Sequence, residues 1–320
     1  MRYIVKCLVA VLAFSFVALS ALSAKGAKLE EELELETPAG NLYGTLLLPA
    51  DNSLATVVLI IPGSGPTDRD GNSTVAGKNN SLKMLAEGLA EKGIASLRID
   101  KRGIAKSRAA ALDEADMRFE DMVEDAVGWL TLLKKDSRFK KLGVVGHSEG
   151  SLVGMLAANI VDVSYFVSIA GVGRPAYEVL EDQLSNQLTP QLLDTAMYYM
   201  DELQAGREVA NPNPLFASLF RPSVQPYMIS WFKYNPASEI TKLKAKILLV
   251  QGTTDIQVGS ADLTRLASAA PNAKELIING MNHVLKHVSG GKSEQMKSYA
   301  NPDLSLADGL LEGIAKFLKS

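Results

Sequence analysis

Six short, unbroken apolar runs constrain the fold of this chain more than any other feature. They are ATVVLIIP (55–62), GIASLRID (93–100), KLGVVG (141–146), SYFVSIAG (164–171), AKILLVQG (245–252) and AKELIING (273–280). Apolar runs of this length without alternation are typical of strands that are buried on both faces. Between several of them lie segments with apolar residues at three- and four-residue spacing, which indicates amphipathic helices. This alternation predicts an α/β fold with a mostly parallel central sheet and helices on both faces.

Two segments depart from the alternation. EELELETPAGNLYGTLLLP (31–49) has alternating apolar residues on either side of a turn, which predicts an antiparallel hairpin at one edge of the sheet. The connection from Gly171 to Lys246 is far longer than the usual length of about two to six residues. We expect residues 173–239 to form a helical cap on a core made of residues 27–172 and 240–320.

Residues 1–26 have the pattern of a secretory signal peptide, with two basic residues, an apolar run from Cys7 to Leu22 and small residues after it. We expect cleavage after Ser23 or Gly26, export across the inner membrane to the periplasm or the medium, and no stable membrane association afterwards. The alternative is a retained anchor, but the run is shorter than the roughly 20 residues that span a bilayer. Cys7 is the only cysteine, so the mature chain would have no thiol for disulfides, catalysis or metal ligation.

The charge pattern excludes one class of partner. Acidic and basic residues number 36 and 33, for a formal net charge of -3, and they are scattered along the chain. Nucleic-acid binding requires a basic patch or stripe, so we expect no nucleic-acid partner. The glycine-rich segment LIIPGSGPTDRDGN (59–72) lacks the Lys-Ser/Thr of a phosphate-binding loop, and we expect no cofactor.

The strongest functional signal is G-H-S-E-G (146–150). The pattern G-x-S-x-G is weak by itself, because glycine and serine are common. Here it lies between a predicted strand (142–145) and a predicted helix (152–160), so Ser148 stands at a sharp strand-to-helix turn that exposes a nucleophile. The flanking glycines remove side chains that would collide where the helix packs on the strand. We interpret Ser148 as a nucleophile.

A serine hydroxyl needs a base, and the base needs an acid that orients it. Of the three histidines, His147 adjoins the serine and is expected to pack or bond locally, whereas His283 follows a predicted strand in a short loop. Asp255 also follows a strand end, so the order Ser148, Asp255, His283 places all three at the carboxyl edge of the sheet. The alternatives are a helix cap for Asp255 and a metal pair of His283 with His287, which lacks a third ligand, so we expect no metal.

The oxyanion of an acyl-transfer reaction needs backbone donors. We expect one to be the N–H of Glu149, directly after the nucleophile, and the other to be the N–H of Ser64 in the loop after the first long parallel strand. Gly63 and Gly65 let the backbone of this loop approach a substrate closely.

Four motifs together resemble those of the α/β hydrolases: P-G-S-G-P-T-D-R-D-G, L-R-I-D-K-R-G, G-H-S-E-G, and the pair Q-G-T-T-D-I-Q-V with G-M-N-H. The chain is similar to secreted bacterial serine hydrolases, a group that includes carboxylesterases and serine aminopeptidases. The resemblance covers essentially the whole mature chain and implies the α/β-hydrolase fold. It also implies Ser148 as nucleophile, His283 as base and Asp255 as acid, with Ser64 and Glu149 as donors. The loop that contains Ser64 departs from the pattern, because it begins Pro-Gly where many relatives have His-Gly.

We expect hydrolysis of small-molecule carboxylic esters through an acyl-enzyme. The alternatives are an amide or peptide hydrolase, which usually needs a charged anchor for the substrate terminus, and a thioesterase. A catalytically inactive binding protein is disfavoured because the three residues occur in the expected order. Epoxide hydrolases and dehalogenases would have Asp in place of Ser148.

Two further groups of residues have two interpretations each. The aromatic residues of the cap either pack it onto the core or line an acyl pocket; they are Phe216, Phe220, Tyr227, Trp231 and Phe232. Asp68, Arg69 and Asp70 either contact the substrate or form a salt-bridged surface turn of little energetic consequence.

Overall fold

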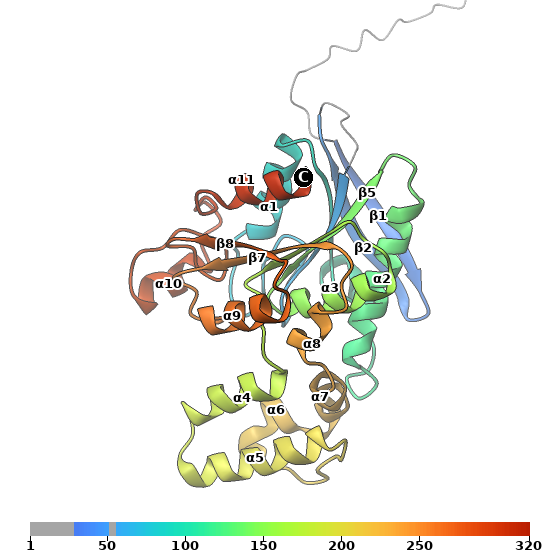
Figure 1. Ribbon diagram of the computed structural model, residues 1–320. Helices are drawn as coiled ribbons and strands as arrows, with labels where there is room; N and C mark the ends of the chain where they lie inside the picture. The colour runs from blue at the N-terminus through green and yellow to red at the C-terminus, as the bar shows by residue number, and fades with distance from the viewer. Residues whose placement is uncertain (1–28, 51–55) are drawn as a thin grey trace, which may run out of the picture.

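The computed structural model of the chain describes residues 29–50 and 56–320. The described residues form a sheet of eight strands in the order β1-β2-β4-β3-β5-β6-β7-β8 (Figure 1). The strands are β1 (Leu29–Thr37), β2 (Gly40–Leu48), β3 (Thr56–Ile61), β4 (Ala95–Ile99), β5 (Lys141–His147), β6 (Tyr165–Ile169), β7 (Lys246–Gly252) and β8 (Lys274–Ile278). The predicted signal peptide, residues 1–26, lies outside the described residues. Among the described helices, none has the length and apolar character needed to cross a membrane.

The sheet is antiparallel only at its β1 edge. β1 pairs with β2, and β2 with β4, in antiparallel registers, whereas every pair from β4 through β8 is parallel. The burial of the strands follows this order: β3 is buried at all six positions, while β1 alternates between exposed and half-buried residues. The predicted fold class, a mostly parallel sheet entered through an antiparallel hairpin, is confirmed.

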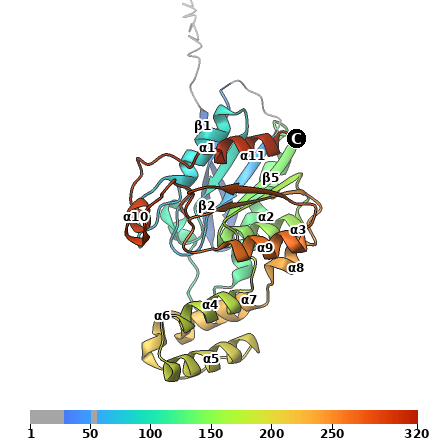
Figure 2. The same cartoon turned by 60° about the vertical axis from the view of Figure 1, so that its left-hand side comes forward.

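Helices cover both faces of the sheet (Figures 1 and 2). The helices around the sheet are α1 (Ser81–Glu91), α2 (Phe119–Lys135), α3 (Glu149–Ile160), α8 (Pro236–Ile240), α9 (Ser260–Ala269), α10 (Lys292–Ser298) and α11 (Leu310–Leu318). On one face of the sheet, apolar side chains of the strands form a buried cluster with those of α1 and α11. On the opposite face, strand side chains form a second buried cluster with those of α2, α3 and α9. Because β4, β3, β5, β6, β7 and β8 run in the same direction, their carboxyl ends lie at one edge of the sheet.

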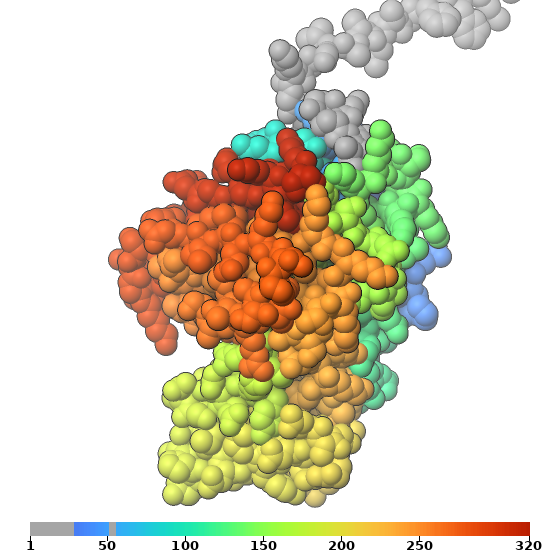
Figure 3. Space-filling model, in the orientation of Figure 1, coloured from blue at the N-terminus to red at the C-terminus, as the bar shows by residue number. Residues whose placement is uncertain are grey.

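The stretch predicted as a cap contains α4 (Ala176–Ser185), α5 (Pro190–Gln204), α6 (Ala217–Phe220) and α7 (Gln225–Phe232). These helices lie together at one end of the molecule, coloured from yellow-green to pale orange in Figure 3. They have a buried apolar cluster of their own, to which Met200, Leu203 and Phe220 belong. Leucines at four-residue spacing, Leu180, Leu184, Leu188 and Leu192, pack against this cluster.

Candidate active site

Ser148 lies where β5 ends and α3 begins, in a backbone conformation that L-residues rarely adopt, with φ 55° and ψ -124°. Its N–H donates to the backbone oxygen of Ile169 at 2.9 Å, which ties the turn to β6. Only glycine fits on either side: a Cβ on Gly146 would lie 2.4 Å from the oxygen of Gly150, and a Cβ on Gly150 would lie 2.5 Å from that of Ile61. The motif therefore holds the serine at the edge of the sheet on a rigid connection.

His283 and Asp255 form a buried pair beyond the ends of β8 and β7. The distance from Nδ1 to Oδ2 is 2.8 Å, and the side chains are 6% and 1% exposed. Since a carboxylate only accepts, Nδ1 donates and Nε2 is left with its lone pair free for a proton. The other carboxylate oxygen accepts from the N–H groups of Gln257 and Val258. Burial alone would raise the pKa of Asp255, but the bonds from His283 and these amides hold it below its ordinary value.

The sequence left two alternatives open, a helix cap for Asp255 and a metal pair of His283 with His287. Asp255 does not cap α9, which begins at Ser260 after Gly259. His287 is exposed, and the described part of the chain has no group of three or more His, Cys, Asp or Glu side chains placed to hold a metal ion.

His147 bonds across a long sequence distance, so the expectation of a local contact is wrong. Its Nε2 donates to the backbone oxygen of His283 at 2.8 Å, and the two ring centroids are 4.8 Å apart. Burial, together with the nearby His283, lowers the pKa of His147 to about 4. His147 is therefore neutral at neutral pH and joins the loop that contains His283 to the turn that contains the nucleophile.

The two residues predicted as oxyanion donors flank Ser148. Glu149 is the first residue of α3, where a helix leaves backbone N–H groups without intrahelical acceptors. Gly63 packs on the nucleophile, since a Cβ there would lie 3.1 Å from the Cβ of Ser148. Ser64 follows it, is exposed, and lines the same cavity as Ser148 and Glu149. Their role as donors stays a prediction.

A cavity of about 850 Å³ opens beside Ser148, between the carboxyl edge of the sheet and the cap helices. Most of its lining is apolar and comes from both parts of the chain, including Met117, Met122, Leu152, Val179, Leu180, Leu219 and Val224. Tyr227 and Trp231 also line it, while Phe216, Phe220 and Phe232 belong to the buried cluster of the cap. Tyr227 and Trp231 also contact Phe119 of α2, so these two have both of the expected roles, whereas the other three pack within the cap itself.

The arginines that line the cavity are neutralised by carboxylates. The pairs are Arg102 with Asp125, Arg174 with Asp262 and Arg221 with Glu114. Because each arginine is paired with a carboxylate, it adds a polar surface to the cavity and no unpaired positive charge.

The sequence reasoning missed Lys101 beside the nucleophile, and it did not predict the side-chain contact between Tyr227 and Glu149. Tyr227 donates its hydroxyl to Glu149 Oε1 at 3.3 Å, and burial raises the pKa of Glu149 despite Lys101 and Tyr227 nearby. Lys101 places its Nζ 2.6 Å from the backbone oxygens of both Gly63 and Gly65. The signal for Lys101 was its place in L-R-I-D-K-R-G, directly after a predicted strand.

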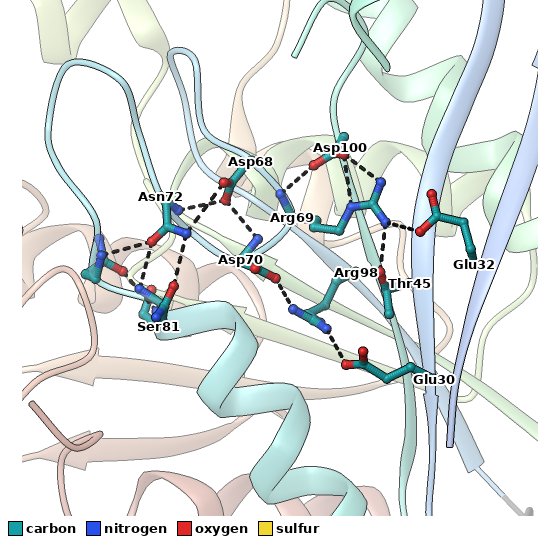
Figure 4. A network of polar contacts seen from close by, with 12 residues as sticks. Glu30, Glu32, Thr45, Asp68, Arg69, Asp70, Asn72, Ser81, Arg98 and Asp100 are labelled. Atoms are coloured by element: carbon teal, nitrogen blue, oxygen red, sulfur yellow. Dashed lines mark hydrogen bonds and ion pairs between the residues drawn. The ribbon is translucent and has the colours of Figure 1, made fainter. Parts of the chain in front are cut away.

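Asp68, Arg69 and Asp70 lie outside the lining of the cavity beside Ser148, and their bonds are not those of a simple surface turn. Figure 4 shows that they pin the loop after β3 onto β4. Arg69 donates to the carboxylate of Asp100 from its backbone N–H and from its guanidinium, at 2.9, 2.9 and 2.6 Å. Asp70 pairs with Arg98, and Asp68 accepts from the N–H of Asp70. Because the side chains of Asp100 and Arg98 are only 2% and 3% exposed, this is a buried network and not a surface turn.

Solved structures define the class of the fold. Est1E from Butyrivibrio proteoclasticus matches with a TM-score of 0.56 and 17% identity, over 90% of this chain and 96% of that one. The esterase Pf2001 from Pyrococcus furiosus matches with a TM-score of 0.57 and 16% identity, over 92% and 91% of the two chains. The α/β hydrolase GrgF from Penicillium sp. sh18 has a TM-score of 0.53, at 17% identity over 80% and 91%. These likenesses concern the fold, which is that of the α/β hydrolases.

The family follows from the sequence match. The model of the family described as serine aminopeptidase, S33, matches residues 76–287, and the chain belongs to this family. The match includes Ser148, Asp255 and His283 and begins after Ser64. A curated relative, Esterase EstD from Thermotoga maritima, is 28% identical over 275 residues, which are 81% of this chain and 61% of that protein. The chain therefore spans less than two thirds of the length of this relative.

Proposed function

We propose that the protein is a serine hydrolase that cleaves carboxylic esters, with Ser148, His283 and Asp255 as its catalytic residues. The observation that carries the proposal is the strained turn at Ser148, which opens to the cavity beside a buried histidine–aspartate pair. A strained nucleophile with a base and an orienting acid is the arrangement that acyl transfer requires. The similarity to an esterase supports the same reaction class.

In this reaction His283 Nε2 takes the proton of the Ser148 hydroxyl as Oγ attacks the ester carbonyl carbon. The carbonyl oxygen becomes an oxyanion, which the N–H groups of Ser64 and Glu149 stabilise. Collapse of this intermediate breaks the bond to the alcohol oxygen, which takes the proton from His283 and leaves the acyl group on Ser148. Water then loses a proton to His283, attacks the acyl carbon and releases the acid, which restores Ser148. Asp255 stays ionised and stabilises the imidazolium.

The cavity favours an ester over the free terminus of a peptide. An aminopeptidase binds the ammonium group of its substrate most simply with an unpaired carboxylate. Among the described residues, the carboxylates that line the cavity are Glu114 and Glu149. Glu114 accepts from Arg221 and Ser223, whose bonds lower its pKa, and Glu149 accepts from Tyr227 and has a raised pKa. An apolar acyl group fits such a wall better than a charged terminus.

The test is hydrolysis of p-nitrophenyl esters, from acetate to decanoate, by the wild-type protein and by Ser148→Ala. We expect turnover by the wild type and a loss of at least about a thousandfold in the variant. Aminoacyl p-nitroanilides and acyl thioesters serve as competing substrates in the same assay. Turnover of these alone, with no ester cleaved, would replace the esterase by one of the two alternatives.

A further inference from the structure

Lys101 holds two backbone carbonyls of the loop after β3. Lys101 lies two residues beyond the end of β4, and its Nζ is 2.6 Å from the oxygens of Gly63 and Gly65. These two carbonyls flank Ser64, whose N–H is the predicted oxyanion donor. The close polar contacts of the ammonium group are thus with neutral carbonyls, and Glu149 acts on it from farther away.

The geometry of one peptide unit determines what this contact does. The C=O of Gly63 and the N–H of Ser64 belong to the same planar unit, and the described residues include no cis peptide bond. In a trans peptide the C=O and the N–H point in opposite directions. A Gly63 oxygen fixed on Lys101 therefore turns the Ser64 N–H to the side away from the ammonium group. No described residue accepts a hydrogen bond from this N–H, so it is available to an oxyanion.

The loop also lies at the right place for this role. A Cβ on Gly63 would lie 3.1 Å from the Cβ of Ser148, so this part of the loop is in contact with the nucleophile. The far end of the loop has its own anchor, because Arg69 is bound to the buried carboxylate of Asp100. Loss of the Lys101 contacts therefore releases the Gly63–Ser64 peptide, whereas Thr67 still holds the oxygens of Ser64 and Gly65 and Arg69 still attaches the far end of the loop to β4.

The stability of the fold does not explain a lysine at this position. Burial lowers the pKa of Lys101, which means that its charged form is held at a cost in free energy. A charged group without a close opposite charge is weak support for a fold. A cost of this kind is typical of residues that serve the reaction.

From these contacts we propose that Lys101 is a positioning residue, which orients the Gly63–Ser64 peptide so that the Ser64 N–H points to the oxyanion. The inference rests on the proposed function, because it assigns a task within that reaction. Lys101 acts through the backbone of the loop and exchanges no proton with the substrate.

The first test compares Lys101→Met with Lys106→Met, a control whose ammonium group is exposed and paired with Glu32 on the surface. Loss of one oxyanion donor costs about 100- to 1000-fold in kcat, so a donor that is merely misdirected should cost about 10- to 100-fold. We expect this loss in kcat for p-nitrophenyl butyrate with KM within about twofold. A trifluoromethyl ketone, which forms a hemiketal oxyanion on the serine, should bind weaker by the same factor. The control should match the wild type.

Two results would overturn the inference. One is a kcat and a KM in Lys101→Met that equal those of the wild type. The other is a raised KM with kcat unchanged. Lys101 would then stabilise the bound substrate and the transition state equally, and would have no part in the stabilisation of the oxyanion.

A rescue experiment separates the ammonium group from the packing of its stem. In the full chain with Cys7→Ser, the variant Lys101→Cys has a single thiol. Alkylation with 2-bromoethylamine rebuilds a side chain of lysine length with its ammonium group, whereas iodoethane adds only the apolar stem. We expect the first reagent to restore most of the lost kcat and the second to restore none. Equal recovery with both reagents would contradict the inference.

Crystal structures of the wild type and Lys101→Met test the inference without a substrate. We expect the Gly63–Ser64 peptide to be rotated or disordered in the variant, and a peptide in its wild-type orientation would overturn the role of Lys101. If the wild type cleaves no ester, the proposed function fails, and these structures still show whether Lys101 orients the peptide.

Discussion

The two carboxylate oxygens of Asp255 have different tasks, and this makes a selective substitution available. Oδ2 accepts from His283 Nδ1, while Oδ1 accepts from the N–H groups of Gln257 and Val258. In Asp255→Asn the amide oxygen can keep the two backbone bonds, but the amide nitrogen faces His283 as a donor. The histidine must then carry its proton on Nε2, where it cannot accept the proton of Ser148.

We therefore expect Asp255→Asn to lower kcat by about 1000- to 10,000-fold while the fold is kept. Steady-state kinetics on a p-nitrophenyl ester measure the loss in kcat. Thermal unfolding shows whether the fold is kept, and we expect a Tm within a few degrees of the wild type. A loss of less than tenfold would remove Asp255 from the role of orienting acid.

The buried Lys286 should make the free energy of unfolding depend on pH. The side chain is fully buried, and its Nζ contacts the backbone oxygen of Leu304 and the Sδ of Met84. Burial lowers its pKa to about 8 from the ordinary value of 10.5. Between these two pH values the unfolded chain binds more protons than the folded one, so the free energy of unfolding rises with pH across this window. Below pH 8 both states are protonated and this stabilisation is absent.

Lys286→Met removes the titrating group, so the variant should lack this rise. From pH 7.5 to 10.5 we expect the wild type to gain about 1 kcal/mol or more in free energy of unfolding relative to the variant. Urea unfolding of both proteins at several pH values measures the difference. A difference that stays constant over the window would mean that Lys286 titrates with its ordinary pKa.

For single residues, the sequence predicts the location of the three proposed catalytic side chains and does not predict the contacts of Lys101. Ser148, Asp255 and His283 each follow a strand end, and the ends of parallel strands meet at one edge, so their location at this edge of the sheet could be predicted. Lys101 also follows a strand end, but its partners are backbone oxygens 38 and 36 positions earlier in the chain. No residue pattern marks a carbonyl as an acceptor, and contacts of this kind emerge only from the folded chain.

At the scale of elements, the packing of α3 on the end of β3 depends on one glycine. A Cβ on Gly150 would lie 2.5 Å from the backbone oxygens of both Ile61 and Pro62. Backbone atoms in a buried strand cannot move aside as a flexible side chain would. We expect Gly150→Ala to lower the free energy of unfolding by about 3 kcal/mol, at the upper end of the usual cost of overpacking.

The matched control is Gly259→Ala, because a Cβ at Gly259 meets nothing within 4 Å and its φ is -94°. Urea unfolding should place this variant within about 0.5 kcal/mol of the wild type. Equal stabilities of the two variants would show that α3 shifts on the strand without cost.

The elements themselves were predictable to different degrees, for physical reasons. All six apolar runs form strands where the sequence places them, to within a few residues. The prediction that each is buried on both faces is wrong for β8, an edge strand that is exposed at three of its five positions. The second half of the cap is harder to predict, since prolines lie at the start of two 3₁₀ turns (Pro214–Phe216 and Pro222–Val224) and of the short helix α7 (Gln225–Phe232).

At the scale of the whole molecule, the cavity is a joint product of two separately packed parts. The cap helices have their own buried cluster, and the cavity lies where they face the carboxyl edge of the sheet. Val179 on α4 lines this cavity and lies outside the cap cluster, so its side chain can be enlarged without disturbing that cluster. Glu181 on the same helix is exposed and offers a matched position for the same bulky residue.

Val179→Trp should fill part of the cavity on its cap side, so the loss should depend on the length of the acyl chain. We expect kcat/KM for p-nitrophenyl decanoate to fall by about tenfold or more and that for the acetate to stay within about twofold, because only the longer chain needs the occupied space. Glu181→Trp should leave both values unchanged. Equal losses for the two esters would mean that the acyl chain does not reach this wall, and the cavity under the cap would then accommodate the alcohol portion of the substrate.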